Sequence, residues 1–173
     1  MKFRVMSLCA AMLLASGTAV WADGPGDPAA AKQDENGMWR DKGGDPTFKI
    51  GADGTVDFST YAGFRRYHSE CHVCHGPDGA GSSYAPALAD SVKTMDYGTF
   101  AGTVVNGRQN LANGNNNVMP SFAENKNVTC YLNDIYVYLR ARSQDALQRG
   151  RPAKHEQKNA VYDADETKCL AGG

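Results

Sequence analysis

The sequence predicts a mostly α-helical fold with polar arms at both ends. Two stretches carry apolar residues at the spacing of a helix face, one leading into Cys71 and one from about Val128 to Arg142. Residues 23–57 and the segment after residue 143 are rich in charged residues, glycine and proline, which favours loops. A chain of 173 residues is long enough for one such helical domain with extensions.

The first 22 residues have the composition of a secretory signal peptide. Lys2 and Arg4 form a basic start, an apolar run extends from Val5 to Val20, and the small residue Ala22 ends the stretch. This order predicts export to the periplasm and cleavage after Ala22. The apolar run is short and polar sequence follows at once, so we expect no stable membrane insertion; an uncleaved membrane anchor is the alternative.

The mature chain divides into three parts by composition. Residues 23–57 form a polar N-terminal extension, in which the Asp53-Gly54 turn predicts a small hairpin. Residues 58–143 form the helical domain, and residues 144–173 form a polar C-terminal tail. The two arms are therefore expected to lie outside the main core.

The charge of the mature chain excludes one class of partner. Without Lys2 and Arg4 the chain keeps 18 − 2 = 16 basic side chains against 19 acidic ones, so its net charge is 16 − 19 = −3. Nucleic-acid binding needs a basic face or stripe. A mildly acidic chain lacks this feature, and no nucleic-acid partner is expected.

The first helix is expected to begin at Ser59 and to lead into Cys71. Gly63 lies inside this helix, where glycine costs about 1 kcal/mol relative to alanine. A close approach of another helix is a physical reason to keep a glycine there. Gly63 therefore predicts a tight helix crossing.

The middle of the domain carries helix start and stop signals. A short helical piece is expected up to Met95, and Asp96 is expected to cap a helix from Tyr97 to Asn106 that stops at Gly107. The asparagine-rich segment at residues 110–117 is typical of turns, and whether it binds an ion stays open. The last helix is expected from about Val128 to Arg142, capped by Asn127 or Thr129.

The strongest motif is Cys71-His72-Val73-Cys74-His75, a C-x-x-C-H sequence. Two thiols three positions apart on one helical turn can each add to a vinyl group of the same haem, and the histidine after them can bind its iron. A zinc site would need two more ligands at short spacing, and a dithiol redox pair would need a surrounding βαβ pattern. The motif therefore predicts one covalently attached haem c.

The second axial position of the iron separates electron carriers from haem enzymes and sensors. Met119 is the predicted ligand, because it follows a long loop and precedes Pro120, which stiffens the backbone. Met95 is the alternative ligand, and packing in the core is the alternative role for Met119. With His75 and Met119 both bound, no position stays open for a substrate. We then expect one-electron exchange and no enzymatic activity.

The remaining histidines are not expected to bind iron. His68 precedes the motif on the incoming helix and is expected to point elsewhere. His72 lies between the two cysteines, where a surface position is expected. His155 lies in the polar tail, where a solvated side chain is expected.

From about residue 61 to residue 142 the chain resembles a class I cytochrome c. The motifs that carry this resemblance are Gly63-Phe64, the C-x-x-C-H motif, Pro86-Ala87-Leu88, Met119-Pro120 and Tyr138-Leu139. The resemblance implies that the first and last helices cross closely at Gly63. It also implies that the carbonyl of Pro86 accepts a hydrogen bond from the ring N–H of His75 and orients the ring. Ordinary packing is the alternative role for Pro86.

A narrower set of motifs is similar to the methanol-metabolism-related cytochromes c of methylotrophs. The set comprises the four mature cysteines and the stretches 105–107, 127–132, 138–142 and 149–152. The resemblance implies electron transfer from a quinoprotein (PQQ) methanol or alcohol dehydrogenase to a downstream cytochrome c or a terminal oxidase. It also implies a disulfide between Cys130 and Cys169 that ties the tail to the domain, with two free thiols as the alternative.

Two other classes of function stay open at this point. A haem enzyme or gas sensor would lack Met119 on the iron and would need a polar pocket there. A fixed cytochrome subunit of a dehydrogenase complex would use the two arms as contact surface.

Overall fold

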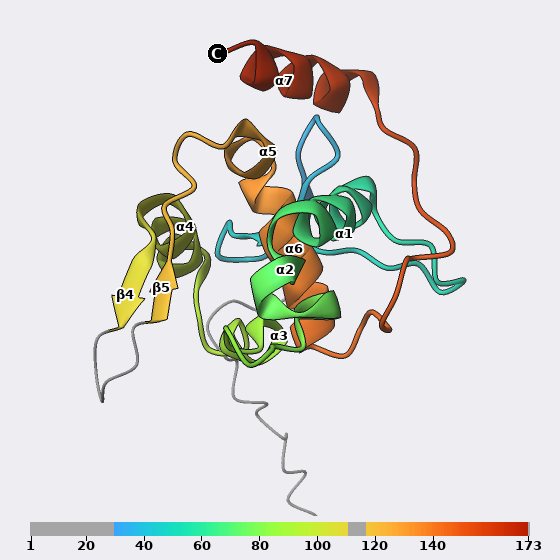
Figure 1. Cartoon of the computed structure of the whole chain (residues 1–173). Coiled ribbons are helices and arrows are strands. Elements are labelled where there is room, and N and C mark those ends of the chain that lie inside the picture. Colours follow the sequence, from blue (N-terminus) through green and yellow to red (C-terminus); the bar gives the residue numbers. More distant parts are fainter. Residues whose placement is uncertain (1–29, 111–116, 173) are drawn as a thin grey trace, which may run out of the picture.

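The computed structural model describes residues 30–110 and 117–172. The expected signal peptide and most of the asparagine-rich segment lie outside the described residues. The helices are α1 (Phe58–Glu70), α2 (His72–His75), α3 (Leu88–Ser91), α4 (Tyr97–Asn106), α5 (Lys126–Thr129), α6 (Leu132–Ser143) and α7 (Ala160–Ala171), with a 3-10 turn at Pro77–Gly79. The predicted mostly α fold is confirmed. In Figure 1, α1, α2 and α6 occupy the centre, α4 lies to one side and α7 lies at one end.

Two small antiparallel sheets accompany the helices. The first contains β1 (Lys32–Gln33), β2 (Trp39–Arg40) and β3 (Pro46–Thr47), in that order, and was not expected from the sequence. The second pairs β4 (Arg108–Asn110) with β5 (Asn117–Met119) and sets Arg108 opposite Met119. The predicted hairpin around Gly54 is present as one antiparallel bridge between Ile50 and Val56.

Helix α1 begins at Phe58 because Asp57 caps it. The Asp57 carboxylate accepts hydrogen bonds from the Thr60 amide at 2.8 Å and the Thr60 hydroxyl at 2.7 Å. The same carboxylate accepts from the Lys49 amide at 2.7 Å. Asp57 therefore fixes the start of the first helix and holds the N-terminal extension against it.

Helices α1 and α6 cross at Gly63, where the sequence predicted a tight helix crossing. A Cβ atom on Gly63 would lie 1.9 Å from the carbonyl oxygen of Asp134 and 2.8 Å from the Cβ of Tyr138, both on α6. No side chain fits that space, so only glycine allows this approach. Beside the crossing, the Tyr67 and Tyr138 rings lie 5.4 Å apart and the Phe64 and Tyr138 rings 5.7 Å apart.

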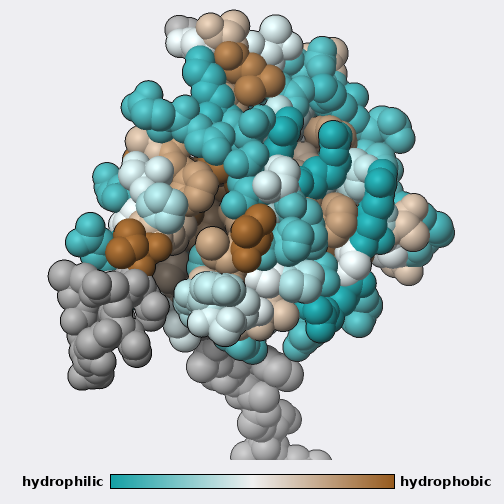
Figure 2. Space-filling model, in the orientation of Figure 1, coloured by the Kyte–Doolittle hydropathy of each residue, from teal (hydrophilic) through white to brown (hydrophobic). Residues whose placement is uncertain are grey.

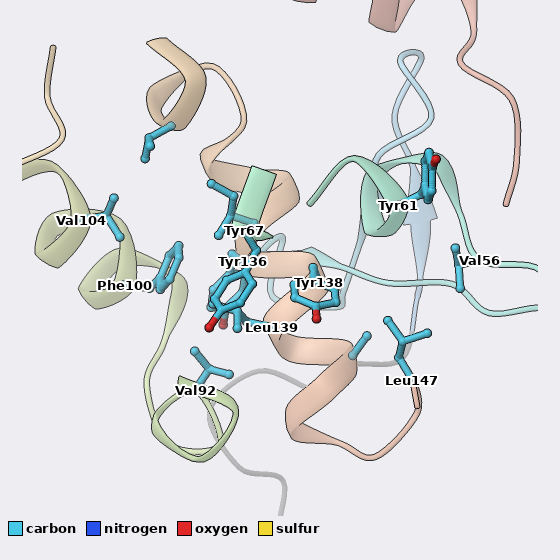
Figure 3. Close-up of a cluster of buried hydrophobic side chains, with 13 residues drawn as sticks. Val56, Tyr61, Tyr67, Val92, Phe100, Val104, Tyr136, Tyr138, Leu139 and Leu147 are labelled. Carbon is cyan, nitrogen blue, oxygen red and sulfur yellow. The ribbon is translucent and has the colours of Figure 1, made fainter. Parts of the chain in front are cut away.

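The core is built on the buried face of α6. Ile135, Tyr136, Tyr138 and Leu139 are each at most 1% exposed. Figure 3 shows Tyr136, Tyr138 and Leu139 gathered on the α6 ribbon, with Phe100 of α4 facing Tyr136. The centroids of the Phe100 and Tyr136 rings lie 5.2 Å apart, so α4 packs on α6 through aromatic contact.

Helix α4 has the bounds that its capping signals predicted. The Asp96 side chain accepts a hydrogen bond from the Thr99 amide at 2.6 Å, and the helix runs from Tyr97 to Asn106. Gly107 follows with a φ of 73°, a conformation that favours glycine.

The prediction of one continuous last helix from about residue 128 is wrong at its start. Asn125, not Asn127 or Thr129, caps the short helix α5, and the helix breaks at Tyr131, which has φ −123° and ψ 19°. The break lets the Tyr131 ring lie under the guanidinium of Arg66 on α1, 3.7 Å from its centroid. Tyr131 is 2% exposed, so aromatic burial stabilises the bend.

The C-terminal tail is more ordered than its polar composition indicated. It carries α7, which Asn159 caps by accepting from the Tyr162 amide at 2.8 Å. The Tyr162 ring packs edge-on against Phe58 at 4.8 Å, and its hydroxyl donates to Asp134 at 2.6 Å. A single aromatic residue thus anchors α7 on both α1 and α6.

Among residues 30–110 and 117–172, no helix combines the length and the apolar character needed to cross a membrane.

Replacing Gly63 by alanine is expected to lower the free energy of unfolding by about 3 kcal/mol or more, because the new methyl group overlaps the α6 backbone. Gly98→Ala is the matched control, since its Cβ would meet only the Asp96 side chain at 3.5 Å. That variant should stay within about 1 kcal/mol of wild type. Denaturant unfolding measures both; equal stability of the two variants would refute a tight crossing.

The free energy of unfolding is expected to fall as the pH rises from about 4 to about 7. Burial raises the pKa of Asp134 from 3.8 to about 7; the Tyr162 hydroxyl opposes this and the charges of Asp57 and Glu166 add to it. In that range the folded chain holds a proton that the unfolded chain releases, so the native state loses stability with rising pH, by at most about 4 kcal/mol. Burial also raises the pKa of Asp57, which acts in the same direction.

Asp134→Asn should reduce this pH dependence, because the amide stays neutral at every pH. Thermal unfolding at pH values across the range measures the effect, with the exposed Asp90→Asn as control. A variant that keeps the wild-type pH dependence would show that Asp134 is already ionised in the folded state.

Candidate functional site

The end of α1 places the two cysteines and the histidine on one turn. The Cys71 amide donates to the Tyr67 carbonyl at 2.9 Å and so closes α1. The His75 amide then donates to the Cys71 carbonyl at 3.0 Å, which forms the single turn of α2. Cys71 is half-buried, Cys74 is exposed, and both thiols are free. Burial raises the pKa of the Cys71 thiol to about 12.

The ring of His75 is buried and oriented by one hydrogen bond. Its Nδ1 atom lies 2.9 Å from the carbonyl oxygen of Pro86, and the residue is 7% exposed. A carbonyl can only accept, so Nδ1 carries the proton and Nε2 is the ring atom with a lone pair. The hydrogen bond that the resemblance implied is therefore present in the structure.

The segment from Gly76 to Pro86, which we call the ligand loop, is folded back on the motif. The Gly81 amide donates to the His75 carbonyl at 2.8 Å, and the Tyr67 hydroxyl donates to the Gly76 carbonyl at 2.6 Å. The Ser82 hydroxyl donates to the Cys74 carbonyl at 2.5 Å. These three contacts fix the route by which Pro86 reaches the ring of His75.

Sequence reasoning missed Asp78, which lies in the ligand loop. Its carboxylate accepts from the Tyr138 hydroxyl at 3.2 Å and the Gly150 amide at 3.1 Å, and lies 3.4 Å from Arg149 Nε and from His68 Nε2. Burial favours a higher pKa for Asp78, but these partners outweigh it and lower the pKa below its usual value. The His68 ring therefore points toward Asp78.

Met119 ends β5 and is held beside α4. The Ser121 hydroxyl donates to the Val105 carbonyl at 2.6 Å, and the Phe122 amide donates to the Val104 carbonyl at 3.1 Å. A Cβ on Gly107 would lie 2.6 Å from the Met119 carbonyl oxygen, so the turn after α4 needs a glycine. The backbone directly after Met119 is therefore held against α4.

The elements that carry His75 and Met119 lie on either side of a hollow. In Figure 1, β5 stands across from α2, and Figure 2 shows the surface hollowed between them, with brown apolar surface on both sides. Half-buried apolar side chains from α3 to the segment after β5 pack against the core, namely Leu88, Met95, Tyr97, Met119 and Phe122. The C-x-x-C-H motif on one side of the hollow and the strand that ends in Met119 on the other make this hollow the candidate cofactor site.

Known proteins are similar to this chain in sequence, and one solved structure is similar in fold. No family model matches the chain. The chain is 36% identical over 100 residues to cytochrome c-555 of Methylococcus capsulatus (strain Bath). The aligned region covers 57% of this chain and 75% of that protein. The chain belongs to the c-type cytochromes.

Two further matches cover more of this cytochrome. It is 52% identical over 138 residues to cytochrome c-553I of Paracoccus denitrificans, covering 80% of this chain but only 61% of that protein. The crystal structure of the c-type cytochrome XoxG from Methylobacterium extorquens AM1 matches with a TM-score of 0.75 and 54% identity, covering 82% of this chain and 86% of that one. The resemblance to a mostly helical cytochrome c is confirmed.

The site of this cytochrome fits the cofactor of its family, covalently attached haem. Cys71 and Cys74 are free thiols on one turn, as thioether attachment requires. His75 has its Nδ1 hydrogen-bonded and its Nε2 left as the metal-binding atom, the usual arrangement for a histidine ligand. When bound, haem supplies one-electron exchange at its iron.

The other methionine and histidine candidates are placed by their contacts. Met95 is half-buried, packs against the core and offers its carbonyl to the Tyr136 hydroxyl at 3.5 Å. His72 is half-exposed, with Nδ1 3.1 Å from the His68 carbonyl. His155 is partly exposed in the tail, and its ring also stacks on Tyr61 with centroids 3.6 Å apart.

Proposed function

We propose that this cytochrome carries single electrons in the periplasm, with one haem c attached through Cys71 and Cys74. His75 and Met119 are the two axial ligands of the iron, and Pro86 orients His75. With both axial positions filled, no position stays open for substrate, and the protein exchanges electrons without transforming a molecule. The observation that supports this proposal is the hollow between α2, which ends in His75, and β5, which ends in Met119 (Figures 1 and 2).

The proposed electron donor is a quinoprotein (PQQ) methanol or alcohol dehydrogenase, and the proposed acceptor is a downstream cytochrome c or a terminal oxidase. The motifs shared with methanol-metabolism-related cytochromes support this donor, and the match to XoxG over most of both chains supports the assignment to the c-type cytochromes. The signal-peptide pattern at the N-terminus supports the periplasm.

The chain's own residues serve electron exchange in this proposal. Pro86 fixes the plane and tautomer of the His75 ring, which keeps the ligand in place in both oxidation states. The thioether of Met119 is a neutral, soft ligand that favours the reduced iron and raises the potential. The apolar side chains around the hollow exclude water from the site.

The folded C-terminal tail argues against the alternative function, a fixed subunit in a dehydrogenase complex. Helix α7 packs on the chain's own α1 and α6 through Tyr162. The Cys130 and Cys169 sulfur atoms lie 1.98 Å apart, at bonding distance. An arm that covers its own domain favours a separate carrier.

Absorption spectroscopy of the ferric protein tests the ligand assignment. Wild type is expected to show the weak far-red band of a methionine–iron bond, and Met119→Ala should lose it and bind carbon monoxide when reduced. Met95→Ala is the matched control and should keep the band. Absence of the band in wild type, with tight carbon monoxide binding, would defeat the carrier proposal in favour of an enzyme or sensor.

Stopped-flow reduction by a purified quinoprotein methanol dehydrogenase tests the donor separately. We expect second-order reduction of the ferric cytochrome by the enzyme in the presence of methanol. Reduction by a small-molecule reductant but not by any quinoprotein alcohol dehydrogenase would leave the carrier assignment standing and remove the proposed donor.

A further inference from the structure

The C-terminal tail contacts the ligand loop at Asp78. We propose that the tail residues Arg149 and Gly150 hold the ligand loop through Asp78, and so set the strength of His75 as an iron ligand. The inference rests on the proposed binding of iron by His75. In it Asp78 is a positioning residue, because it acts on the iron only through the loop.

Asp78 has a backbone conformation that its contacts must maintain. Its φ is 59°, in the left-handed region that residues other than glycine rarely adopt. Its side chain is 9% exposed and receives the Gly150 amide, the Tyr138 hydroxyl and Arg149. The Asp78 carbonyl accepts from Arg142 Nε at 3.3 Å, so both the side chain and the backbone of Asp78 are held.

The held position of Asp78 is passed on to His75 within a few residues. Asp78 lies between Gly76, whose carbonyl binds Tyr67, and Gly81, whose amide binds the His75 carbonyl. The loop then runs to Pro86, the partner of His75 Nδ1. A shift of the loop therefore changes the hydrogen bond that makes the imidazole electron-rich.

The tail has its own fixed path, so it can act as a support. Leu147 is 8% exposed within the core cluster, and its carbonyl accepts a hydrogen bond from Arg142. After Gly150, His155 forms a parallel bridge with Val56. The Lys154 carbonyl then accepts from the Val56 amide at 3.2 Å. The segment is anchored on both sides of the two residues that contact Asp78.

The charges around Asp78 explain why the ligand loop depends on Arg149. The carboxylate is largely buried, and the cationic or titratable side chains that face it are Arg149 from the tail, His68 from α1 and Tyr138 from α6. A buried carboxylate needs hydrogen bonds and compensating charge. Without Arg149 the carboxylate keeps fewer partners, and we expect the loop to leave its left-handed turn more often.

The test compares Asp78→Asn and Arg149→Gln with Arg151→Gln in the haem-loaded protein. Arg151→Gln removes the same charge from the same segment but contacts Tyr61 and not the loop. Arg149 has a side chain that is 62% exposed, so its variant should fold even if Asp78→Asn does not.

Two readouts report on His75 itself, namely hydrogen exchange of its ring Nδ1–H by NMR and the midpoint potential. In Asp78→Asn and Arg149→Gln the exchange should be faster by about tenfold or more, as expected for a hydrogen bond that opens more easily. The potential should rise, because a less electron-rich imidazole stabilises the ferric iron less. Arg151→Gln should match wild type in both.

The inference would be overturned if Asp78→Asn and Arg149→Gln kept the wild-type exchange rate and midpoint potential and only lowered the melting temperature. Asp78 would then be a purely structural residue. The same result for Arg151→Gln as for Arg149→Gln would also overturn the inference, since the effect would then come from charge alone. A wild-type spectrum without histidine ligation would instead refute the proposed function on which the inference rests.

Discussion

The contact between α1 and α6 at Gly63 is the constraint on which the rest of the structure depends. Because Gly63 has no side chain, the α6 backbone at Asp134 lies directly against α1. That approach sets the distance between the end of α1, where the C-x-x-C-H motif begins, and the aromatic face of α6. Tyr67 and Tyr138 then meet beside the crossing, and Tyr67 holds the first residue of the ligand loop.

Two buried carboxylates connect this crossing to the tail. Asp134 lies at the crossing and accepts from Tyr162 of α7, and Asp78 lies in the ligand loop and accepts from Gly150. Their electrostatic situations differ: burial raises the pKa of Asp134, whereas the partners of Asp78 outweigh burial and lower its pKa. The tail thus contacts the domain both at its structural centre and beside the site.

Much of the site could be predicted from sequence because its signals are local. The spacing of Cys71, Cys74 and His75 follows from the chemistry of one cofactor, and a single helical turn is enough to bring them together. Asp96 and Gly107 act on the nearest backbone groups, so the bounds of α4 were also predictable. Met119 was predicted as the second ligand because Pro120 follows it, and this role stays a prediction.

Features that depend on distant residues could not be predicted in this way. The break at Tyr131 is stabilised by Arg66, which lies far away in the chain, and helical periodicity does not report it. Helix α7 was not expected from the sequence, because Tyr162 is its one buried residue and its partners Phe58 and Asp134 lie far away in the chain. Asp78 resembles an ordinary turn residue until the tail is seen beside it.

The central claim is that one haem is bound through Cys71 and Cys74 and that the tail is tied back through Cys130 and Cys169. Intact mass spectrometry of the unreduced mature protein, with thiol counting by alkylation, tests this most directly. We predict one haem for each chain, no alkylated cysteine, and a start at Asp23. Alkylation of Cys71 or Cys74 in the haem-loaded protein, or of both Cys130 and Cys169, would contradict the account.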